Sequence, residues 1–179
     1  MLVSPEQAIV SSKQAYAQTL QPLKKEGKVD SNPVVAARVQ EITGRIIYQA
    51  IQIYPHSQSW EWSIKVIDDP KMVNAWCMAG GKMAIYTGLL NKVDPTDDEL
   101  AQVLSHEISH ALANHTAERM SVAMASTIGV VAVGVVSDRP GVAMTGAAAA
   151  AALAIKKPNS RRSESEADEI GGELAAKGG

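Results

Sequence analysis

The N-terminal third of the chain alternates apolar and polar residues at helical spacing. Between residues 4 and 23 the apolar positions are scattered among polar ones, whereas between residues 33 and 54 they form a continuous stripe. Pro33 follows Ser31 and Asn32, and proline is favoured at the first position of a helix. We therefore expect N-terminal helices within residues 4–54, joined by a charged linker over residues 24–30.

The periodicity becomes that of strands over residues 60–88. Apolar residues first alternate with polar ones, at Trp60, Trp62, Ile64 and Val66. Two further short runs, residues 72–78 and 82–87, are separated by Gly80 and Gly81, a pair typical of a tight turn. The pattern predicts a small sheet over residues 60–88.

Helical spacing returns over residues 97–120. Thr96 and Glu99 form a capping-box signature, which places the start of a helix at this point. The apolar positions behind the cap follow one helix face, and they are Leu100, Val103, Leu104, Ile108, Ala111 and Leu112. With a last helix over residues 161–177, the chain is expected to form a single α+β domain across residues 1–179, mostly helical with a small sheet beside the 97–120 helix.

Residues 121–155 are rich in alanine and almost without charge. Residues 137–141 interrupt this segment, and neither half reaches the roughly 18 apolar residues of a membrane span. Alanine and glycine also drive membrane insertion weakly. We expect a helical hairpin buried against the 97–120 helix, and the alternative is a contact with a membrane surface or another subunit.

Composition limits the classes of function. The chain has 179 residues, 46% of them hydrophobic and 20% charged, which suits one soluble domain. A net charge of −2 gives no indication of nucleic-acid binding. The lone Cys77 excludes an intramolecular disulfide and is expected to be a buried residue on a strand. Polar sequence directly after Met1 predicts a cytosolic protein or a chain that starts at its mature domain.

Candidate chemistry lies within the 97–120 helix, where residues 106–110 read H-E-x-x-H. His106 and His110 are about 40° apart around a helix, so their imidazoles project from one face and can bind one zinc ion. Glu107 follows His106 and can reach a water molecule activated by the metal, as a general base does. The motif is short, and the alternative is a solvent-facing helix with two histidines. The capping box and the apolar stripe favour the zinc site.

A zinc site of this kind needs a third ligand, and residues 160–168 supply carboxylates. Glu164 and Asp168 are four residues apart and share a helix face, so one can bind the metal while the other holds a ligand imidazole. Glu166 is about 200° from Glu164 and is expected to point away. A charged, solvated start of a helix is the alternative.

Metzincins use H-E-x-x-H-x-x-G-x-x-H, and this chain has Ala113 and Thr116 at the positions of the glycine and the last histidine. His115 is one position early, about 140° around the helix from His110. The metzincin class is therefore excluded. We expect His115 to pack beside the metal ligands rather than to bind the metal.

Three stretches resemble the HtpX and CAAX-prenyl-endopeptidase type of zinc metallopeptidases, a branch of the gluzincins. They are residues 74–82 with 86–90, residues 106–115, and residues 160–171, and they come in the order that the family has. The resemblance is strongest to its periplasmic lipoprotein branch, which includes LoiP-like and BepA-like proteases. It implies a zincin-like fold and a periplasmic domain, associated with the outer membrane through a lipid anchor that this chain lacks.

The resemblance also implies a role for each matching residue. His106, His110 and Glu164 would bind one zinc ion per chain, Glu107 would be the general base, and Asp168 would orient a ligand histidine. A strand bordering the cleft could pair with an extended peptide, and it consists of Asn74, Ala75, Trp76, Cys77 and Met78. Family members continue past the position of Gly179, so functions of a later segment are not assigned.

We therefore expect a zinc-dependent endopeptidase that degrades unfolded or misassembled cell-envelope proteins. One alternative is a chaperone-like or scaffold protein with a little-used protease site. Another is a structural zinc domain, which would have a fourth protein ligand.

The sequence does not identify the residue that stabilises the oxyanion. Related gluzincins tend to place a His, Tyr or Arg donor after the glutamate ligand, and none follows Glu164 here. The candidates are Tyr86, His115 and Arg161, or a donor on a segment absent from this chain, which we favour.

Overall fold

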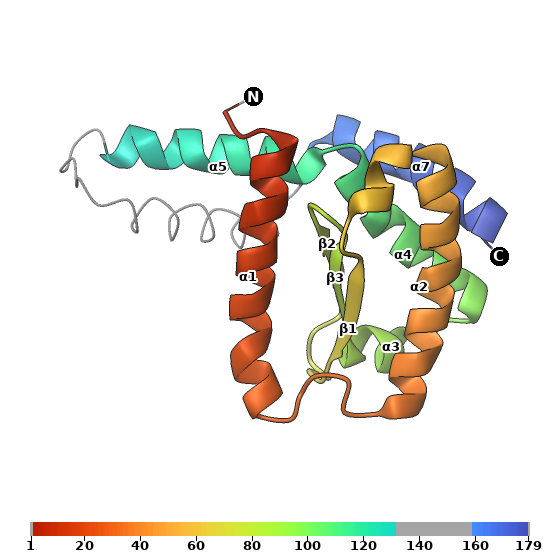
Figure 1. The fold of residues 1–179 in the computed structure, drawn as a ribbon. Coiled ribbons are helices and arrows are strands. Elements are labelled where there is room, and N and C mark those ends of the chain that lie inside the picture. Colours follow the sequence, from red (N-terminus) through yellow and green to blue (C-terminus); the bar gives the residue numbers. More distant parts are fainter. Residues whose placement is uncertain (1, 132–158, 179) are drawn as a thin grey trace.

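Two long helices stand on opposite sides of a small sheet in the computed structural model, which describes residues 2–131 and 159–178 (Figure 1). They are α1, Pro5–Lys25, and α2, Pro33–Ile53. Ser4 caps α1 through a complete capping box, and Asn32 caps α2 with Pro33 in its first turn. Both N-terminal helices lie where the sequence predicts them. A short 3₁₀ helix, η1, Pro55–Ser59, follows α2.

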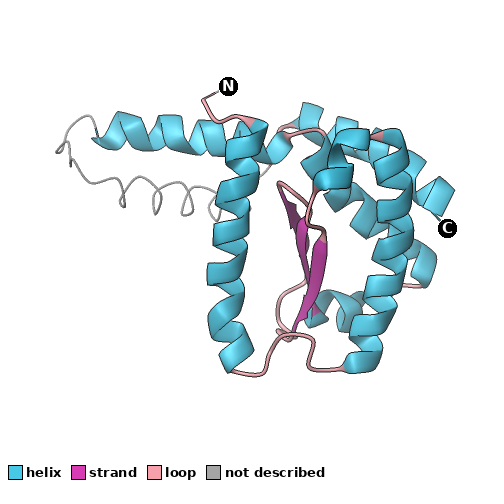
Figure 2. Ribbon diagram, in the orientation of Figure 1, coloured by secondary structure: helices cyan, strands magenta, loops and turns pink. Residues whose placement is uncertain are grey.

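The sheet has three strands in the order β1-β3-β2 (Figure 2). β1, Ser63–Ile67, is parallel to β3, Lys82–Tyr86, and β2, Ala75–Met78, is antiparallel to β3. The loop between β2 and β3 contains Gly80 and Gly81, both with φ near +77° (78° and 76°), a conformation that glycine adopts without strain. The predicted sheet and its tight turn are confirmed, and β2 begins at Ala75 rather than at residue 72.

The two faces of the sheet pack against different helices, because successive side chains of a strand point to opposite sides. Ile64, Cys77, Met83 and Ile85 join the hydrophobic core formed with α2 and with α4, Asp97–Leu112. Ile67, Trp76, Met78 and Ala84 belong to a second core beneath α1. Cys77 is buried on a strand, as expected.

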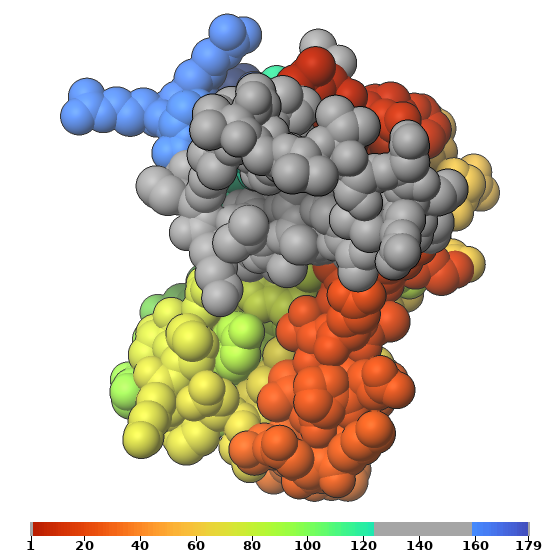
Figure 3. All heavy atoms as spheres, turned by 90° about the vertical axis from the view of Figure 1, so that its left-hand side faces the viewer, coloured from red at the N-terminus to blue at the C-terminus, as the bar shows by residue number. Residues whose placement is uncertain are grey.

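The segment after α1 is held to the sheet by backbone pairing. Val29 forms an isolated antiparallel bridge with Ile67, and Asp30 donates its N–H to the carbonyl of Val66. Seen from the side of α1, the C-terminal half of this helix lies beside the loop that follows β1 (Figure 3). These contacts fix α1 against the face of the sheet that is opposite to α4.

α4 packs closely on α7, Arg161–Gly178, although 48 residues separate Leu112 from Arg161. The capping box of Thr96 and Glu99 is complete at the start of α4. Gly171 makes the close approach possible, because a Cβ atom at this position would lie 3.1 Å from the backbone N and Cα of His106. The last helix is therefore confirmed, and it lies against the H-E-x-x-H motif (Figure 1).

The helix expected over residues 97–120 is two helices, which corrects the sequence interpretation. α4 ends at Leu112, and α5, His115–Val131, starts after a turn in which Asn114 has φ +59°. Asparagine tolerates this left-handed conformation and often ends helices in this way. The apolar spacing continues through the turn, which is why the pattern alone did not reveal it.

The remaining helix, α3, Thr87–Val93, connects β3 to the loop before α4. Of the helical hairpin expected over residues 121–155, residues 132–155 lie outside the described part of the chain. No helix within the described residues is long and apolar enough to cross a membrane. The described elements form an α+β fold, mostly helical with a small sheet, consistent with the zincin-like fold expected.

Candidate active site

Three potential metal ligands meet between α4 and α7. His106 and His110 lie one turn apart on α4, and their Nε2 atoms are 3.2 Å from each other. Glu164, in the first turn of α7, places Oε2 3.2 Å from His106 Nε2 and Oε1 3.6 Å from His110 Nε2. The structure thus brings together the three residues that the sequence nominated, from segments more than 50 residues apart.

The spacing of these atoms fits a tetrahedral metal ion. With bonds of about 2.0–2.1 Å, such an ion keeps its ligand atoms about 3.3 Å apart. The two Nε2 atoms are 3.2 Å apart, close to that value, and Glu164 turns a different carboxylate oxygen to each of them, at 3.2 Å and 3.6 Å. Among the described residues, the group of His, Cys, Asp and Glu side chains that could hold a metal has these three members. Two imidazoles and one carboxylate are a ligand set of catalytic zinc sites.

The outward nitrogens of both histidines also have partners. His106 Nδ1 lies 2.9 Å from Asp168 Oδ1, and His110 Nδ1 lies 2.9 Å from His115 Nδ1. His115 Nε2 is in turn 3.4 Å from Glu166 Oε2. If both Nε2 atoms offer lone pairs to a metal, both Nδ1 atoms carry protons and donate them outward. His110, His115 and Glu166 then form one chain of donors and acceptors.

This arrangement places several predicted residues. Asp168 contacts a candidate ligand, His106, as the spacing from Glu164 indicated. His115 is buried beside His110 rather than among the three ligand atoms. Glu166 points away from the three candidate ligands, as expected, and its carboxylate contacts His115.

Burial shifts the pKa values of Glu107 and His110, both on α4, in opposite directions. It raises the pKa of Glu107 to about 7, while the charges of His106 and Arg119 act to lower it. Burial also lowers the pKa of His110 to about 4, and the neighbouring His106 acts in the same direction. His110 is therefore neutral at pH 7, as a metal ligand must be, and Glu107 has the affinity for protons that a base needs near neutral pH.

A hollow opens beside these residues in the surface between α4 and α7. Its volume is about 420 Å³. It is lined by Gln102, Val103, His106, Glu107, Asp168, Gly171 and Gly172. Glu107 and the candidate ligand His106 thus border this hollow.

Arg119 is a charged neighbour that sequence reasoning missed. It lies on α5, its Nε atom is buried without a hydrogen-bond partner in the described structure, and its charge acts on Glu107 and Glu164. Burial lowers the pKa of Arg119, while the two carboxylates counteract that effect. The turn at Asn114 sets the direction of α5, and no pattern in the sequence predicts where that direction takes residue 119.

Asn159 was missed as well. Its Nδ2 atom lies 3.1 Å from His110 Nε2, on the side of the ring that faces the ligand group. Its Oδ1 atom is buried without a hydrogen-bond partner among the described residues. A lone asparagine before a helix reads as an ordinary turn residue, so only its position in the fold draws attention to it.

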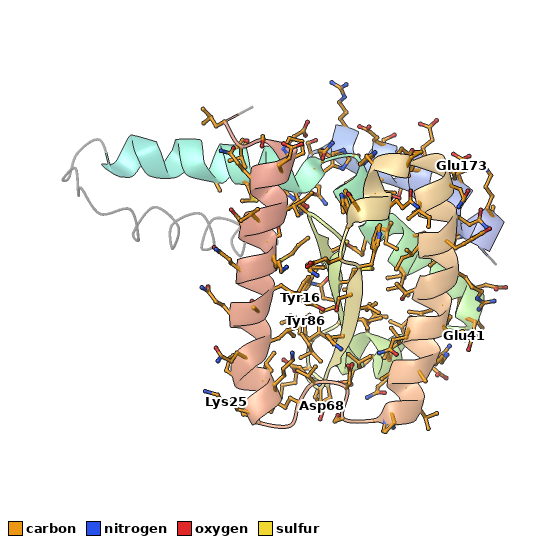
Figure 4. All side chains as sticks on the ribbon, in the orientation of Figure 1. Tyr16, Lys25, Glu41, Asp68, Tyr86 and Glu173 are labelled. Atoms are coloured by element: carbon orange, nitrogen blue, oxygen red, sulfur yellow. The ribbon has the colours of Figure 1, made fainter. Side chains whose placement is uncertain are left out.

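Two of the nominated oxyanion donors lie elsewhere. Tyr86 accepts a hydrogen bond from Trp76 Nε1 and belongs to the core beneath α1, on the face of the sheet opposite to α4. Figure 4 shows Tyr16 and Tyr86 between α1 and the strands. Arg161 is exposed in the first turn of α7. Tyr86 therefore lies away from the ligand group.

Two histidines one turn apart, a carboxylate from a second helix and an adjacent glutamate, beside a small sheet, define a metallopeptidase of zincin-like fold. The chain belongs to peptidase family M48, which its sequence matches over residues 33–179. The family implies a bound metal. The resemblance found at H-E-x-x-H and its flanks is therefore confirmed at the level of the family.

Known relatives come from mitochondria and bacteria. The human mitochondrial metalloendopeptidase OMA1 is 30% identical over 185 residues, covering 99% of this chain and 34% of that protein. The metalloprotease YcaL of Escherichia coli is 35% identical over 117 residues, 60% of this chain and 42% of that protein. A putative beta-barrel assembly-enhancing protease of Vibrio cholerae is 25% identical over 164 residues, 88% and 32% of the two chains. The chain spans less than half the length of each.

Proposed function

We propose that this chain is a zinc-dependent endopeptidase in which His106, His110 and Glu164 bind one zinc ion. The observation that carries the proposal is that these three side chains each place one possible ligand atom within 4.8 Å of the others. A catalytic site keeps one position open, whereas a structural zinc site is closed by a fourth protein ligand. The three-membered group among the described residues favours the catalytic site.

Glu107 is the general base in this proposal. It removes a proton from the attacking water molecule and delivers it to the leaving amide nitrogen, which are the two proton transfers that peptide hydrolysis requires. A bound zinc ion would supply a Lewis acid that polarises the scissile carbonyl and acidifies water. Asp168 and His115 hold the Nδ1 protons of the two ligand imidazoles, which keeps both Nε2 atoms turned inward.

Extended polypeptide is the proposed substrate. β2 lies at an edge of the sheet and pairs only with β3 among the described strands, so an extended peptide can add to its free edge. α4 packs against β2, and the charge of Glu107 acts on the thiol of Cys77, so the edge runs close to the base. Residues 74–78 would select unfolded or misassembled proteins, because folded proteins rarely present an unpaired strand.

We place this activity in the envelope of a bacterium, in the periplasm and associated with the outer membrane. Support comes from two bacterial relatives, one of which is named as a protease that enhances beta-barrel assembly. The relatives named OMA1 are mitochondrial, so the shared property is proteolysis and the compartment is a separate inference.

Zinc analysis combined with casein digestion tests the proposal. We expect about one zinc per chain, cleavage that a chelator abolishes and zinc restores, and no cleavage by Glu107→Gln although that variant keeps its fold and its zinc. Cleavage by Glu107→Gln at the rate of the unaltered chain would show that Glu107 is not the general base. A zinc-loaded chain that prevents aggregation of unfolded proteins but does not cut them, with Glu107→Gln equally effective, would favour the chaperone-like alternative.

A further inference from the structure

Asn159 has an unusual place beside the ligand group. It directly precedes Ser160, whose carbonyl accepts the N–H of Glu164 and whose Oγ accepts the N–H of Ser163. The start of α7 therefore sets Asn159 and Glu164 relative to each other. From there the Asn159 amide extends to 3.1 Å from His110 Nε2.

The hydrogen-bonding capacity of this amide is not used up by the protein. In the described structure its only partner is His110 Nε2, and its Oδ1 atom is buried with none. His110 Nδ1 is occupied by His115, so Nε2 is the nitrogen left to bind a metal. When a metal takes that lone pair, the Asn159 N–H loses its acceptor. A buried amide without partners is unfavourable, so the loaded site must offer it another.

We propose that Asn159 is a catalytic residue whose side-chain N–H donates to the oxygen of the scissile carbonyl as negative charge develops on it. This inference rests on the proposed peptidase function and supplies the oxyanion donor that the sequence did not reveal. Preorganised amide donors are well suited to that task, and the loss of one costs about 10²–10³ in rate. The substrate oxygen then accepts the Asn159 N–H in place of His110 Nε2, whose lone pair binds the metal.

The other donors near the site are less suited. Tyr86 lies beneath α1, Arg161 is exposed, and both ring nitrogens of His115 have partners. The charge of Arg119 acts on the carboxylates of Glu107 and Glu164, so we assign this cation to balancing their charge. A direct bond from Asn159 Oδ1 to zinc is disfavoured, because neutral amide oxygens suit calcium and magnesium better than zinc.

The test compares zinc-loaded Asn159→Ala and Asn159→Asp with the unaltered chain on one fluorogenic peptide. Aspartate has nearly the shape of asparagine but no N–H to donate at neutral pH. We expect kcat to fall about 10²–10³-fold in both variants while KM changes little. Arg162→Ala, a change at an exposed position on the same turn of chain, is the matched control and should behave as the unaltered protein.

Two readouts besides turnover separate the role of a donor from others. Zinc affinity, measured by chelator competition, should change less than about threefold in Asn159→Ala. The affinity for a phosphinic peptide, which mimics the tetrahedral transition state, should weaken in proportion to kcat/KM. Circular dichroism spectra and melting curves of both variants check that each folds.

Four results would overturn the inference. If Asn159→Ala turns over as fast as an active unaltered chain, Asn159 is not the oxyanion donor, and the proposed peptidase function is unaffected. A sharp loss of zinc affinity would make Asn159 a ligand. A fall in kcat with unchanged affinity for the phosphinic peptide would make it structural. If the zinc-loaded unaltered chain cleaves no peptide, the peptidase function fails and this inference fails with it.

Discussion

Burial acts in opposite directions on two side chains of α4 that are three residues apart. It raises the pKa of Glu107 to about 7 from a usual 4.5, and it lowers the pKa of His110 to about 4 from a usual 6.5. Between pH 5 and pH 6 both groups are therefore mainly neutral in the metal-free protein. Burial therefore makes an ionised Glu107 unfavourable in the metal-free protein. A bound cation would favour the ionised form of Glu107.

The stability of the metal-free protein should reveal the raised pKa of Glu107. The folded state holds this proton more tightly than the unfolded state, so ionisation reduces stability as pH rises from about 4.5 to about 7. Glutamine resembles the neutral carboxyl group and removes this loss. We expect chelator-treated Glu107→Gln to be more stable than the unaltered protein at pH 8, by up to about 3 kcal/mol.

Urea denaturation of both chelator-treated proteins at a series of pH values measures this difference. It should be near zero at pH 4.5, grow up to about pH 7 and then stay constant. A difference that is independent of pH, or equal stabilities at pH 8, would show that Glu107 does not have a raised pKa.

At the scale of elements, the distance between α4 and α7 determines whether Glu164 can reach the histidines. Gly171 is a position of close approach between the two helices, with a hypothetical Cβ 3.1 Å from the His106 backbone. Gly172 is the next residue, and a Cβ there would have nothing within 4 Å. The pair offers a test of how strictly packing controls the site.

Gly171→Ala should push α7 away from α4, because the atoms it meets belong to backbone and cannot rotate aside. We expect a loss of about 1–3 kcal/mol in stability, and a lower zinc affinity because Glu164 moves with α7. Gly172→Ala should gain about 0.5–1 kcal/mol, since alanine is favoured over glycine inside helices, and should bind zinc as before. Denaturation curves and chelator competition on both variants give these values. Equal behaviour of the two would contradict the argument.

At the scale of the whole molecule, the candidate ligands join segments far apart in the chain. His106 and His110 lie on α4 and Glu164 on α7, so a metal bound by all three links these helices in the folded state alone. The sheet contributes its β2 edge on the same side, whereas α1 covers the opposite face. Metal binding and folding should therefore be coupled.

We expect zinc to raise the melting temperature of the chain. Free zinc at about 1,000 times its dissociation constant stabilises the folded state by about 4 kcal/mol, which corresponds to roughly 10 °C for a domain of this size. Calorimetry with buffered zinc and with chelator measures the shift. Glu164→Ala should lose most of it. A shift of the same size in Glu164→Ala would show that zinc binds elsewhere.

Much of this protein follows from local spacing in its sequence. The four-residue interval between His106 and His110 places two imidazoles on one helix face in any α-helix, and the same interval pairs Glu164 with Asp168. The capping box of Thr96 and Glu99 marks a helix start for an equally local reason, since it satisfies backbone groups within one turn. For these residues the sequence by itself was sufficient.

Tertiary structure decided the contacts made between elements. A left-handed turn at Asn114 brings His115 to His110, and packing of α7 on α4 brings Asn159 to the ligand group. Tyr86 lies on the face of the sheet that packs against α1, and this places it away from Glu107. Such contacts depend on how helices and strands pack over long separations. Periodicity reports only which face of an element is buried, and not what that face meets.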